Sequence, residues 1–359
     1  MFPARSIHPL PGDHELVTRF RSLIDAFGGR RIVVVGDIIA DEFIYGELSR
    51  VSREAPVLIL KYDSTQIVPG GAGNAANNVA ALGGRACLVG VVGREEAGRR
   101  LRANLHRRVE TGRLVRSAGY RTPTKTRILA GGVHSARQQV VRIDRDASSP
   151  IDAKIRRAFE RAALGAVASC DAVLVSDYGS GLVTPSLVAH IKKRLARSTR
   201  RRRIPILVDS RYDLLRYRGL TACTPNETEV EQMLGVKIGE DSRALERAGR
   251  TILSRTKMAA VLLTRGSRGM ALFERARRAQ QIPIYGSDEV ADVTGAGDTV
   301  IATVTLALAA GASFFEAARL ANYAGGLVVM KRGTATVGAE ELRHAVREDH
   351  AQGASGEEG

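Results

Sequence analysis

A glycine-rich string that ends in an aspartate is the feature of the sequence with the clearest chemistry. It reads Asp-Val-Thr-Gly-Ala-Gly-Asp-Thr over residues 292–299 and runs directly into a long apolar stretch, which predicts a buried helix. Gly295, Ala296 and Gly297 leave no bulk over the helix start, so backbone N–H groups there can approach an anion closely. Asp298 follows in the first turn, where a carboxylate can orient and deprotonate a hydroxyl beside that anion. The string predicts phosphoryl transfer, and a plain Gly-rich turn capped by the aspartate is the alternative.

A second glycine-rich string precedes an Ala-rich stretch much earlier in the chain. It reads Gly-Gly-Ala-Gly-Asn-Ala-Ala-Asn-Asn over residues 70–78. Gly70 and Gly71 would let the backbone approach a sugar closely, and the Asn74 side chain offers donors and an acceptor to hydroxyl groups. An ordinary Gly-rich helix start is the alternative, and the first string in the same chain weakens it.

The elements that must position these strings alternate between short apolar runs and helix-like segments. Buried strands are expected at 31–36, 86–92, 172–176, 204–209, 221–224 and 260–264. Helices are expected at 72–82, 153–168, 184–197, 227–234 and 243–256. This alternation predicts an α/β fold in which helices cover a mostly parallel sheet.

Two segments interrupt the alternation, at about 42–66 and 120–143. They have the pattern of irregular or antiparallel strands, clearest at 57–61 and 139–143. Such strands would form a small second sheet, a lid over the carboxyl ends of the main strands, where open α/β sheets bind ligands.

The domain organisation follows from the same pattern. We expect one domain over 31–340, an N-terminal extension over 1–30 with an amphipathic stretch near 16–27, and a partly disordered tail over 341–359.

Composition and charge exclude several classes of protein. No apolar stretch approaches the roughly 20 residues of a membrane helix, and the N-terminus has no apolar run of the secretory kind. Cys87, Cys170 and Cys223 are far apart, which favours buried thiols of a reducing cytoplasm over a disulfide framework or a zinc site. The net charge of +16 includes a basic run at 200–203. We interpret that run as a solvated loop or helix end, with nucleic-acid binding as the weaker alternative.

The two glycine-rich strings together resemble the N-terminal and C-terminal signatures of the PfkB family of sugar kinases. The resemblance implies a ribokinase-like three-layer αβα sandwich with a β-strand lid, and ATP and Mg²⁺ as phosphoryl donor and cofactor. It implies that Asp298 is the catalytic base and that the preceding amides, at 295–297, form the anion hole. It also implies a homodimer formed through the lid strands, with 57–61 as the candidate interface strand.

Further positions match the family in the order that it requires. Gly36-Asp37-Ile-Ile-Ala-Asp41 follows the first strand; we assign both aspartates to the sugar site, and Asp41 matches the position that holds sugar hydroxyls. Asn226 and Glu229, in Pro-Asn-Glu-Thr-Glu, match the motif that organises Mg²⁺ and phosphates largely through water.

The nucleotide site is implied by two more matches. The turn at 264–269 resembles the nucleotide-binding turn, in which we assign Thr264, Arg265, Gly266 and Gly269 to ATP. Asn322 matches a position that lines the adenine pocket, and Asp292 matches one near which a monovalent cation such as K⁺ binds. Each of these matches taken alone could be an ordinary turn or cap.

A finer resemblance is to the heptose-7-phosphate kinases that supply lipopolysaccharide synthesis. Residues 49–57 are similar to that subfamily's SRISPEAPV segment, and Asn74 follows Gly70 by four residues, as in those enzymes. A phosphorylated sugar needs a cationic anchor. The candidates are lid cations with surface charge as the alternative, namely Lys125, Arg127, Arg142 and Arg53. Asp177 is a candidate sugar ligand or a structural cap, and Asp209 is open in the same way.

Two departures from the heptose pattern keep other functions open. Ser180 and Arg211 stand where the subfamily usually has lysines. If those lysines hold the sugar phosphate, their loss weakens the heptose interpretation, and Arg211 is the candidate to compensate. The alternatives are a kinase for ribose, fructose, fructose 6-phosphate or adenosine, and a noncatalytic sugar or nucleotide sensor. No HxGH-type nucleotidyltransferase string occurs in the sequence, so we expect a kinase without that domain.

Overall fold

The computed structural model describes residues 13–131, 138–147, 150–197, 203–286, 292–331 and 333–355. Within these ranges the largest sheet has nine strands, in the order β15-β14-β13-β12-β11-β10-β1-β4-β6. The strands are β1 (Arg31–Gly36), β4 (Arg85–Val89), β6 (Val109–Glu110), β10 (Ala172–Asp177), β11 (Ile206–Ser210), β12 (Ala222–Cys223), β13 (Ala260–Thr264), β14 (Met270–Glu274) and β15 (Gln280–Ile282). All neighbours from β6 to β13 pair in parallel, and β14 and β15 add an antiparallel edge.

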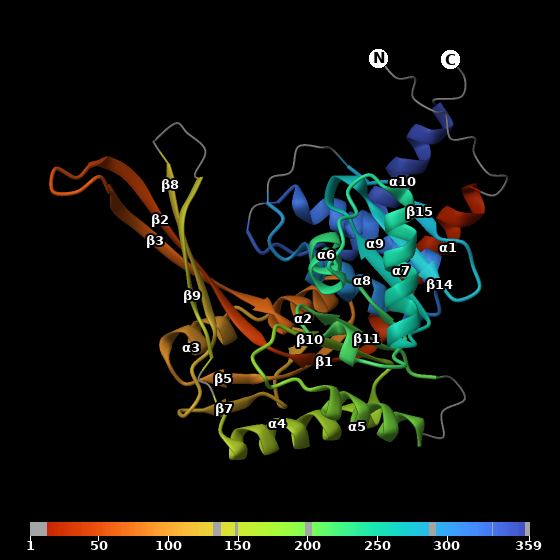
Figure 1. Cartoon of the computed structure of the whole chain (residues 1–359), viewed down its shortest axis with the longest axis horizontal. Helices are drawn as coiled ribbons and strands as arrows, with labels where there is room; N and C mark the ends of the chain where they lie inside the picture. The colour runs from red at the N-terminus through yellow and green to blue at the C-terminus, as the bar shows by residue number, and fades with distance from the viewer. Residues whose placement is uncertain are drawn as a thin grey trace.

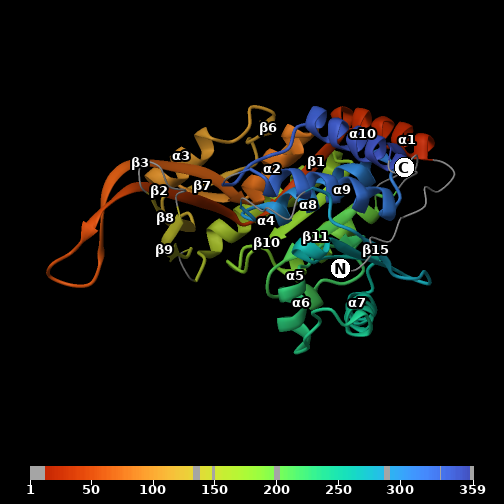
Figure 2. The same ribbon diagram turned by 90° about the horizontal axis from the view of Figure 1, so that it is seen from above.

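Helices cover both faces of this sheet (Figure 1, Figure 2), because its central strands are apolar on both sides. In β1, Ile32 and Val34 join one buried cluster, and Val33 and Val35 join the other. The first cluster includes α1 (Asp13–Asp25), α2 (Ala72–Ala81), α8 (Ala296–Ala310), α9 (Phe314–Val329) and α10 (Ala339–Ser355). The second includes α4 (Ala153–Ala166), α5 (Pro185–Ala196), α6 (Glu227–Leu234) and α7 (Ser242–Thr256). The expected three-layer αβα sandwich is confirmed.

The two interrupting segments form a separate sheet that extends from the body of the molecule (Figure 1), which we call the lid sheet. Its order is β3-β2-β8-β9, with β2 (Ile38–Val51), β3 (Leu58–Gly71), β8 (Thr124–Gly131) and β9 (Gln138–Arg145). Strands β2 and β3 pair antiparallel over far more than 57–61, with register shifts at Tyr45/Gly46 and Leu48/Arg50, and the polar residues of β3 are mostly exposed. Only Asp37 separates β1 from β2, and β3 runs directly into α2.

Both ends of the described chain belong to the packed body. Helix α1 buries Phe20, Leu23 and Ile24, and helix α10 buries Leu342 and Val346. The expected tail over 341–359 is therefore a helix as far as Ser355, because its apolar residues recur at helical spacing and pack on the core. Of the basic run at 200–203, residues 200–202 lie outside the described residues. No helix in the described ranges is both long enough and apolar enough to span a membrane.

Candidate active site

The carboxyl ends of the central strands and the N-terminus of α8 meet at one edge of the sheet. Asp37 follows β1, Tyr178 follows β10, and the side chain of Asp298 projects from the first turn of α8 toward them. From the lid sheet, the Nζ atom of Lys125 lies 5.0 Å from the centroid of the Tyr178 ring. The site is therefore built between the sheet edge and the base of the lid sheet, as the sequence predicts.

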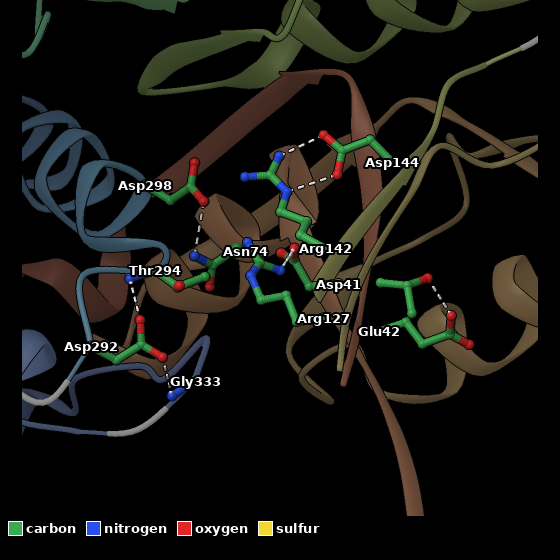
Figure 3. A network of polar contacts seen from close by, with 11 residues as sticks. Asp41, Glu42, Asn74, Arg127, Arg142, Asp144, Asp292, Thr294, Asp298 and Gly333 are labelled. Carbon is green, nitrogen blue, oxygen red and sulfur yellow. Dashed lines mark hydrogen bonds and ion pairs between the residues drawn. The ribbon is translucent and has the colours of Figure 1, made fainter. Parts of the chain in front are cut away.

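Asp298 is buried and is held by two donors. The Nδ2 atom of Asn74 donates to one carboxylate oxygen at 2.9 Å (Figure 3), and the Tyr178 hydroxyl donates to the other at 3.1 Å. Burial raises the pKa of Asp298 to about 7, while the bonds from Asn74 and Tyr178 act in the opposite direction. A carboxyl group with a pKa near neutrality is well matched to general-base catalysis.

The start of α8 depends on the two glycines that flank Ala296. Gly295 is the N-cap residue, and its φ of 81° is a left-handed conformation that favours glycine. A Cβ atom there would lie 2.5 Å from the Asn74 Nδ2 atom, whereas a Cβ on Gly297 would meet nothing within 4 Å. The space over Gly297 is open, so an anion can reach the first amides of the helix.

The glycine-rich string at 70–78 leads into α2 and contacts the same site. Gly71 has a φ of 56°, and a Cβ on it would lie 2.5 Å from the Asp37 carbonyl oxygen. A Cβ on Gly70 would lie 2.1 Å from an Asp41 carboxylate oxygen. Asn74, expected to bind sugar hydroxyls, instead donates to Asp298, and its Oδ1 atom accepts from Asn78 at 3.1 Å. The Nδ2 atom of Asn74 also donates to the Gly295 carbonyl at 3.4 Å, and a contact of Asn74 with a sugar stays a prediction.

Asp41 is buried beside a lid cation. The Arg127 guanidinium donates to its Oδ1 atom at 2.6 Å (Figure 3), and both side chains are largely shielded from water. The ion pair with Asp41 compensates the charge of Arg127, and a contact of Arg127 with a sugar phosphate stays a prediction. Asp41 keeps its second oxygen beside the Gly70 backbone, where a sugar hydroxyl would be held.

A cavity of about 310 Å³ lies between the sheet edge and the lid sheet. Its lining includes two tyrosines, Tyr178 and Tyr212, together with three cations and three aspartates, namely Lys125, Arg142, Arg211, Asp37, Asp144 and Asp146. Burial lowers the pKa of Lys125, and Arg211 nearby acts in the same direction. Arg142 makes a paired bond to Asp144, at 2.7 and 2.6 Å (Figure 3). Arg53 lies in the turn between β2 and β3 and is not part of this lining.

Two aspartates predicted as sugar ligands bind the protein itself. Asp37 accepts bonds from the Tyr178 N–H at 2.8 Å and from the Ser180 hydroxyl at 2.5 Å, and burial raises its pKa to about 6. Asp177 accepts from Gly179, Ser210 and Tyr217 and is not a lining residue of the cavity. The structure thus favours the structural cap for Asp177, whereas Asp37 still borders the cavity.

Asn226 and Glu229 form a capping box at the start of α6. Asn226 Oδ1 accepts from the Glu229 N–H at 2.8 Å, and Glu229 Oε2 accepts from the Asn226 N–H at 3.0 Å. Burial raises the pKa of Glu229. The second carboxylate oxygen of Glu229 has no hydrogen bond to another described residue, so it can still bind water of a hydrated cation.

The turn at 264–269 has the expected shape but a different use for its arginine. Gly266 and Gly269 have φ angles of 57° and 73°, and the Arg265 N–H donates to the Gly269 carbonyl at 2.8 Å. The Arg265 side chain is buried against Glu227 at 2.7 Å and the Gly239 carbonyl at 2.6 Å. Its guanidinium is therefore structural, and a role in ATP binding is left to the backbone of the turn, which begins at Thr264.

Asn322 and Asp292 hold loops around the C-terminal helices. Asn322 Nδ2 donates to the Pro283 carbonyl at 2.8 Å, and its Oδ1 atom has no hydrogen bond to another described residue. The Asp292 carboxylate accepts from the Thr294 N–H at 2.8 Å and the Gly333 N–H at 3.0 Å (Figure 3). Asp292 therefore fixes the loop that leads into α8, and the cation near it remains a prediction.

Tyr178 has a role at the site that the sequence did not suggest, whereas Asp209 was left open there between sugar ligand and cap. Tyr178 lies in a Gly-rich loop with no pattern that distinguishes it, yet its hydroxyl reaches Asp298. Burial raises the pKa of Asp209 well above its usual value, and the charges of Glu229 and Asp298 act in the same direction. The position of Asp209 at the end of a buried strand was the available signal for it.

Comparison with known proteins places the chain among kinases. The model described as pfkB family carbohydrate kinase matches residues 30–341. The Bifunctional protein HldE of Caulobacter vibrioides is 42% identical over 338 residues, which is 92% of this chain and 66% of that protein. Its counterpart from Trichlorobacter lovleyi is 40% identical over 331 residues, 92% of this chain and 65% of that protein. The chain thus spans just under two thirds of the length of these relatives.

Solved structures show the same fold. Ribokinase of Arabidopsis thaliana complexed with ribose and ATP has a TM-score of 0.66 at 21% identity, covering 89% of this chain and 98% of that one. Phosphofructokinase-2 of Escherichia coli in complex with substrates and products has a TM-score of 0.69 at 18% identity, with the same coverage. The expected ribokinase-like fold is confirmed. Together with the family match over most of its length, this shows that the chain belongs to the pfkB family of carbohydrate kinases, phosphotransferases with an alcohol group as acceptor.

Proposed function

We propose that this protein is an ATP-dependent kinase that phosphorylates D-glycero-β-D-manno-heptose 7-phosphate at C1. The observation that carries the proposal is the position of Asp298 at the start of α8, hydrogen-bonded to Tyr178, which lines a cavity whose Lys125 and Arg211 pair with no described carboxylate. The first feature suits deprotonation of a hydroxyl beside an anion hole, and the second suits an acceptor that carries its own phosphate. Identity of about 40% to bifunctional HldE proteins supports the same subfamily. The 1,7-bisphosphate product would serve synthesis of nucleotide-activated heptose for lipopolysaccharide in the cytoplasm.

The reaction begins with Asp298 ionised. Its carboxylate takes the proton of the C1 hydroxyl as that oxygen bonds to the γ-phosphorus of ATP and the bond to the leaving ADP breaks. The backbone N–H of Gly297 donates to the transferred group and stabilises its charge. The N–H of Ala296 donates to the Val293 carbonyl at 3.2 Å and joins the anion hole when that bond opens. Asp41 and the backbone of Gly70 hold the sugar hydroxyls on the other side.

The nucleotide end of the site fits a hydrated divalent cation. When bound, Mg²⁺ neutralises charge on the phosphates of ATP. Glu229, with one oxygen uncommitted, and Asn226 would hold its water shell. No group of three metal-binding side chains occurs in the described ranges. Mg²⁺ commonly keeps several of its waters in protein sites. The turn at 264–269 and Asn322 would border the nucleotide, and K⁺ would bind near Asp292.

The distal phosphate of the sugar would lie against Lys125 and Arg211. Neither side chain makes an ion pair with another described residue, whereas Arg142 is paired with Asp144. Ser180 donates to Asp37 and so stays within the protein. Arg211 would therefore supply the charge that the subfamily draws from lysine, which is the compensation that the heptose assignment requires.

The lid sheet supports a homodimer. It exposes large apolar side chains at Leu48, Val51, Val57, Leu58, Tyr62, Val140, Val141 and Ile143. So many exposed apolar side chains on one small sheet are unfavourable in water and indicate a protein contact. The occupant that we propose is the lid sheet of a second copy, because each copy offers the same apolar strands.

Release of ADP with MgATP over a panel of acceptors tests the proposal. We expect heptose 7-phosphate to exceed ribose, fructose, fructose 6-phosphate and adenosine by at least about a hundredfold in kcat/KM, or about 3 kcal/mol. Lys125→Ala and Arg211→Ala should each raise KM for the sugar phosphate about tenfold and leave KM for ATP within about twofold. If another acceptor has the highest kcat/KM, the assignment of heptose 7-phosphate as the substrate is wrong. If no acceptor is phosphorylated, the noncatalytic sensor is favoured.

A further inference from the structure

The orientation of the candidate base is set by residues outside its own helix. One oxygen of Asp298 accepts from Asn74 in α2, and the other accepts from Tyr178 in the loop after β10. A carboxylate with a donor on each oxygen cannot rotate without breaking a hydrogen bond, and in a buried site such a bond is costly to leave unmade. The direction in which the remaining lone pairs point therefore depends on these two partners.

Tyr178 is itself held from three sides. Its N–H donates to Asp37 at 2.8 Å, and Lys125 lies over its ring at 5.0 Å. A Cβ on Gly71 would lie 3.3 Å from a carbon of the ring, so the glycine backbone packs closely against the aromatic face. The ring therefore has little freedom to move, and its hydroxyl is a fixed reference point for Asp298.

We propose that Tyr178 is a positioning residue for phosphoryl transfer, whose hydroxyl orients the carboxylate of Asp298 and stabilises its ionised form. The proposal rests on the proposed role of Asp298 as base. Tyr178 keeps its own proton throughout, and the proton of the sugar hydroxyl passes to Asp298. Burial and the neighbouring carboxylates raise the pKa of Tyr178 well above its usual value, so the phenol remains a donor at every pH of interest.

Other groups around Asp298 remain in place when the phenol hydroxyl is removed. Asp41 in β2 and Asp209 in β11 favour the protonated carboxyl, whereas Lys125 in β8 favours the ionised one. Asn74 in α2 supplies the second donor. A substitution of Tyr178 by Phe changes none of these residues, so its effect on the titration of Asp298 isolates a single hydrogen bond.

The test is Tyr178→Phe, assayed on the best acceptor of the panel between pH 5.5 and 9. Loss of a hydrogen bond to a charged group should raise the pKa of the acidic limb of kcat/KM by about one unit. A rise from about 7 to about 8 lowers the ionised fraction at pH 7 by about fivefold, and most of the rate returns at pH 9. KM for sugar and for ATP should change less than about twofold.

Tyr217→Phe is the matched control. Its hydroxyl donates to the Asp177 carboxylate at 2.7 Å, so this variant also loses a buried bond from tyrosine to aspartate, but not one to the base. We expect lower stability and an unchanged acidic limb. A loss of rate in Tyr178→Phe that is equal at all pH values, with KM for the sugar raised, would show that the phenol binds substrate and would overturn the proposal. An unchanged profile would overturn it as well.

A measurement independent of turnover separates this proposal from the proposed function. In protein labelled with ¹³C at the aspartate carboxyl carbons, the signal absent from Asp298→Asn identifies Asp298. Its titration midpoint should rise in Tyr178→Phe by about one unit, whichever sugar is the substrate. If Tyr178→Phe does not fold, a fluorinated tyrosine at 178, which is a stronger donor, should lower the midpoint instead. If the titration midpoint of Asp298 moves in neither variant, the positioning role of Tyr178 is wrong. If the wild-type protein phosphorylates no acceptor, only the proposed kinase activity is wrong.

Discussion

Replacement of Asp298 by asparagine is expected to abolish activity and to make the protein more stable above neutral pH. Asp298 is almost fully buried, and its pKa is raised from 3.8 to about 7. Between these two pH values the folded chain binds a proton at this site that the unfolded chain has released. Stability contributed by this group is therefore present at low pH and is lost as pH rises from about 4 to about 7.

The size of the effect follows from the same shift. About three units correspond to roughly 4 kcal/mol of unfolding free energy that the ionised carboxylate costs the native state above pH 7. Asparagine removes this cost. Its amide cannot accept hydrogen bonds from both Asn74 and Tyr178, however, and the lost bond lowers the unfolding free energy by about 1 kcal/mol. The net expectation at pH 8 is a gain of about 2–3 kcal/mol over the wild type, with little gain at pH 4.5.

Urea unfolding of both proteins at pH 4.5 and pH 8 measures this difference, because every other titrating group is common to both and cancels. The variant should also lose about 10²–10⁴-fold in kcat, as expected for loss of a general base. Asp177→Asn is the control, since that carboxylate accepts three protein donors and its loss should destabilise the fold. A stability difference between wild type and Asp298→Asn that is the same at both pH values would refute the reasoning.

Three further substitutions test other parts of the site. Gly295→Ala places a Cβ 2.5 Å from the Asn74 amide at a φ of 81°. This variant should lower the unfolding free energy by about 1–3 kcal/mol and lower kcat at least about tenfold. Wild-type kinetics would contradict the role of this turn. Arg127→Met leaves Asp41 buried without its cation and should cost about 3–5 kcal/mol in urea unfolding, part of which Arg127→Lys should restore. Leu58→Lys, on the exposed lid sheet, should give monomers in analytical ultracentrifugation, and a persistent dimer would exclude this interface.

Much of the architecture could be predicted because the central sheet is buried on both faces. An apolar, β-branched run such as 31–36 gives an unambiguous strand, and β1 has the predicted bounds. The Ala-rich segment expected as a helix over 72–82 is α2, which ends one residue earlier. Exposed lid strands were harder, because polar residues such as Lys61 and Asp63 hide the alternation that burial would impose.

Hydrogen-bond partners in the site could not be predicted in the same way. Asn74 has the chemistry to bind a sugar hydroxyl, and nothing local shows that Asp298, more than two hundred residues later, takes its amide. Asp177 was open between ligand and cap until the hydroxyl groups of Ser210 and Tyr217 were placed beside it. Residue type indicates what a side chain can bind, whereas the fold determines which partner lies within hydrogen-bond distance of it.

The bonds that hold Asp298 also set the order in which the chain can become active. They join segments separated by 224 residues, to Asn74, and by 120 residues, to Tyr178. Contacts between such distant segments form late in folding, because the entropy cost of closing a long loop must be met before the contacts can stabilise the chain. A refolding molecule can therefore regain helices and strands while its carboxylate is still unoriented. Recovery of enzymatic turnover should lag behind recovery of far-ultraviolet circular dichroism, which makes activity a reporter of complete assembly of the domain.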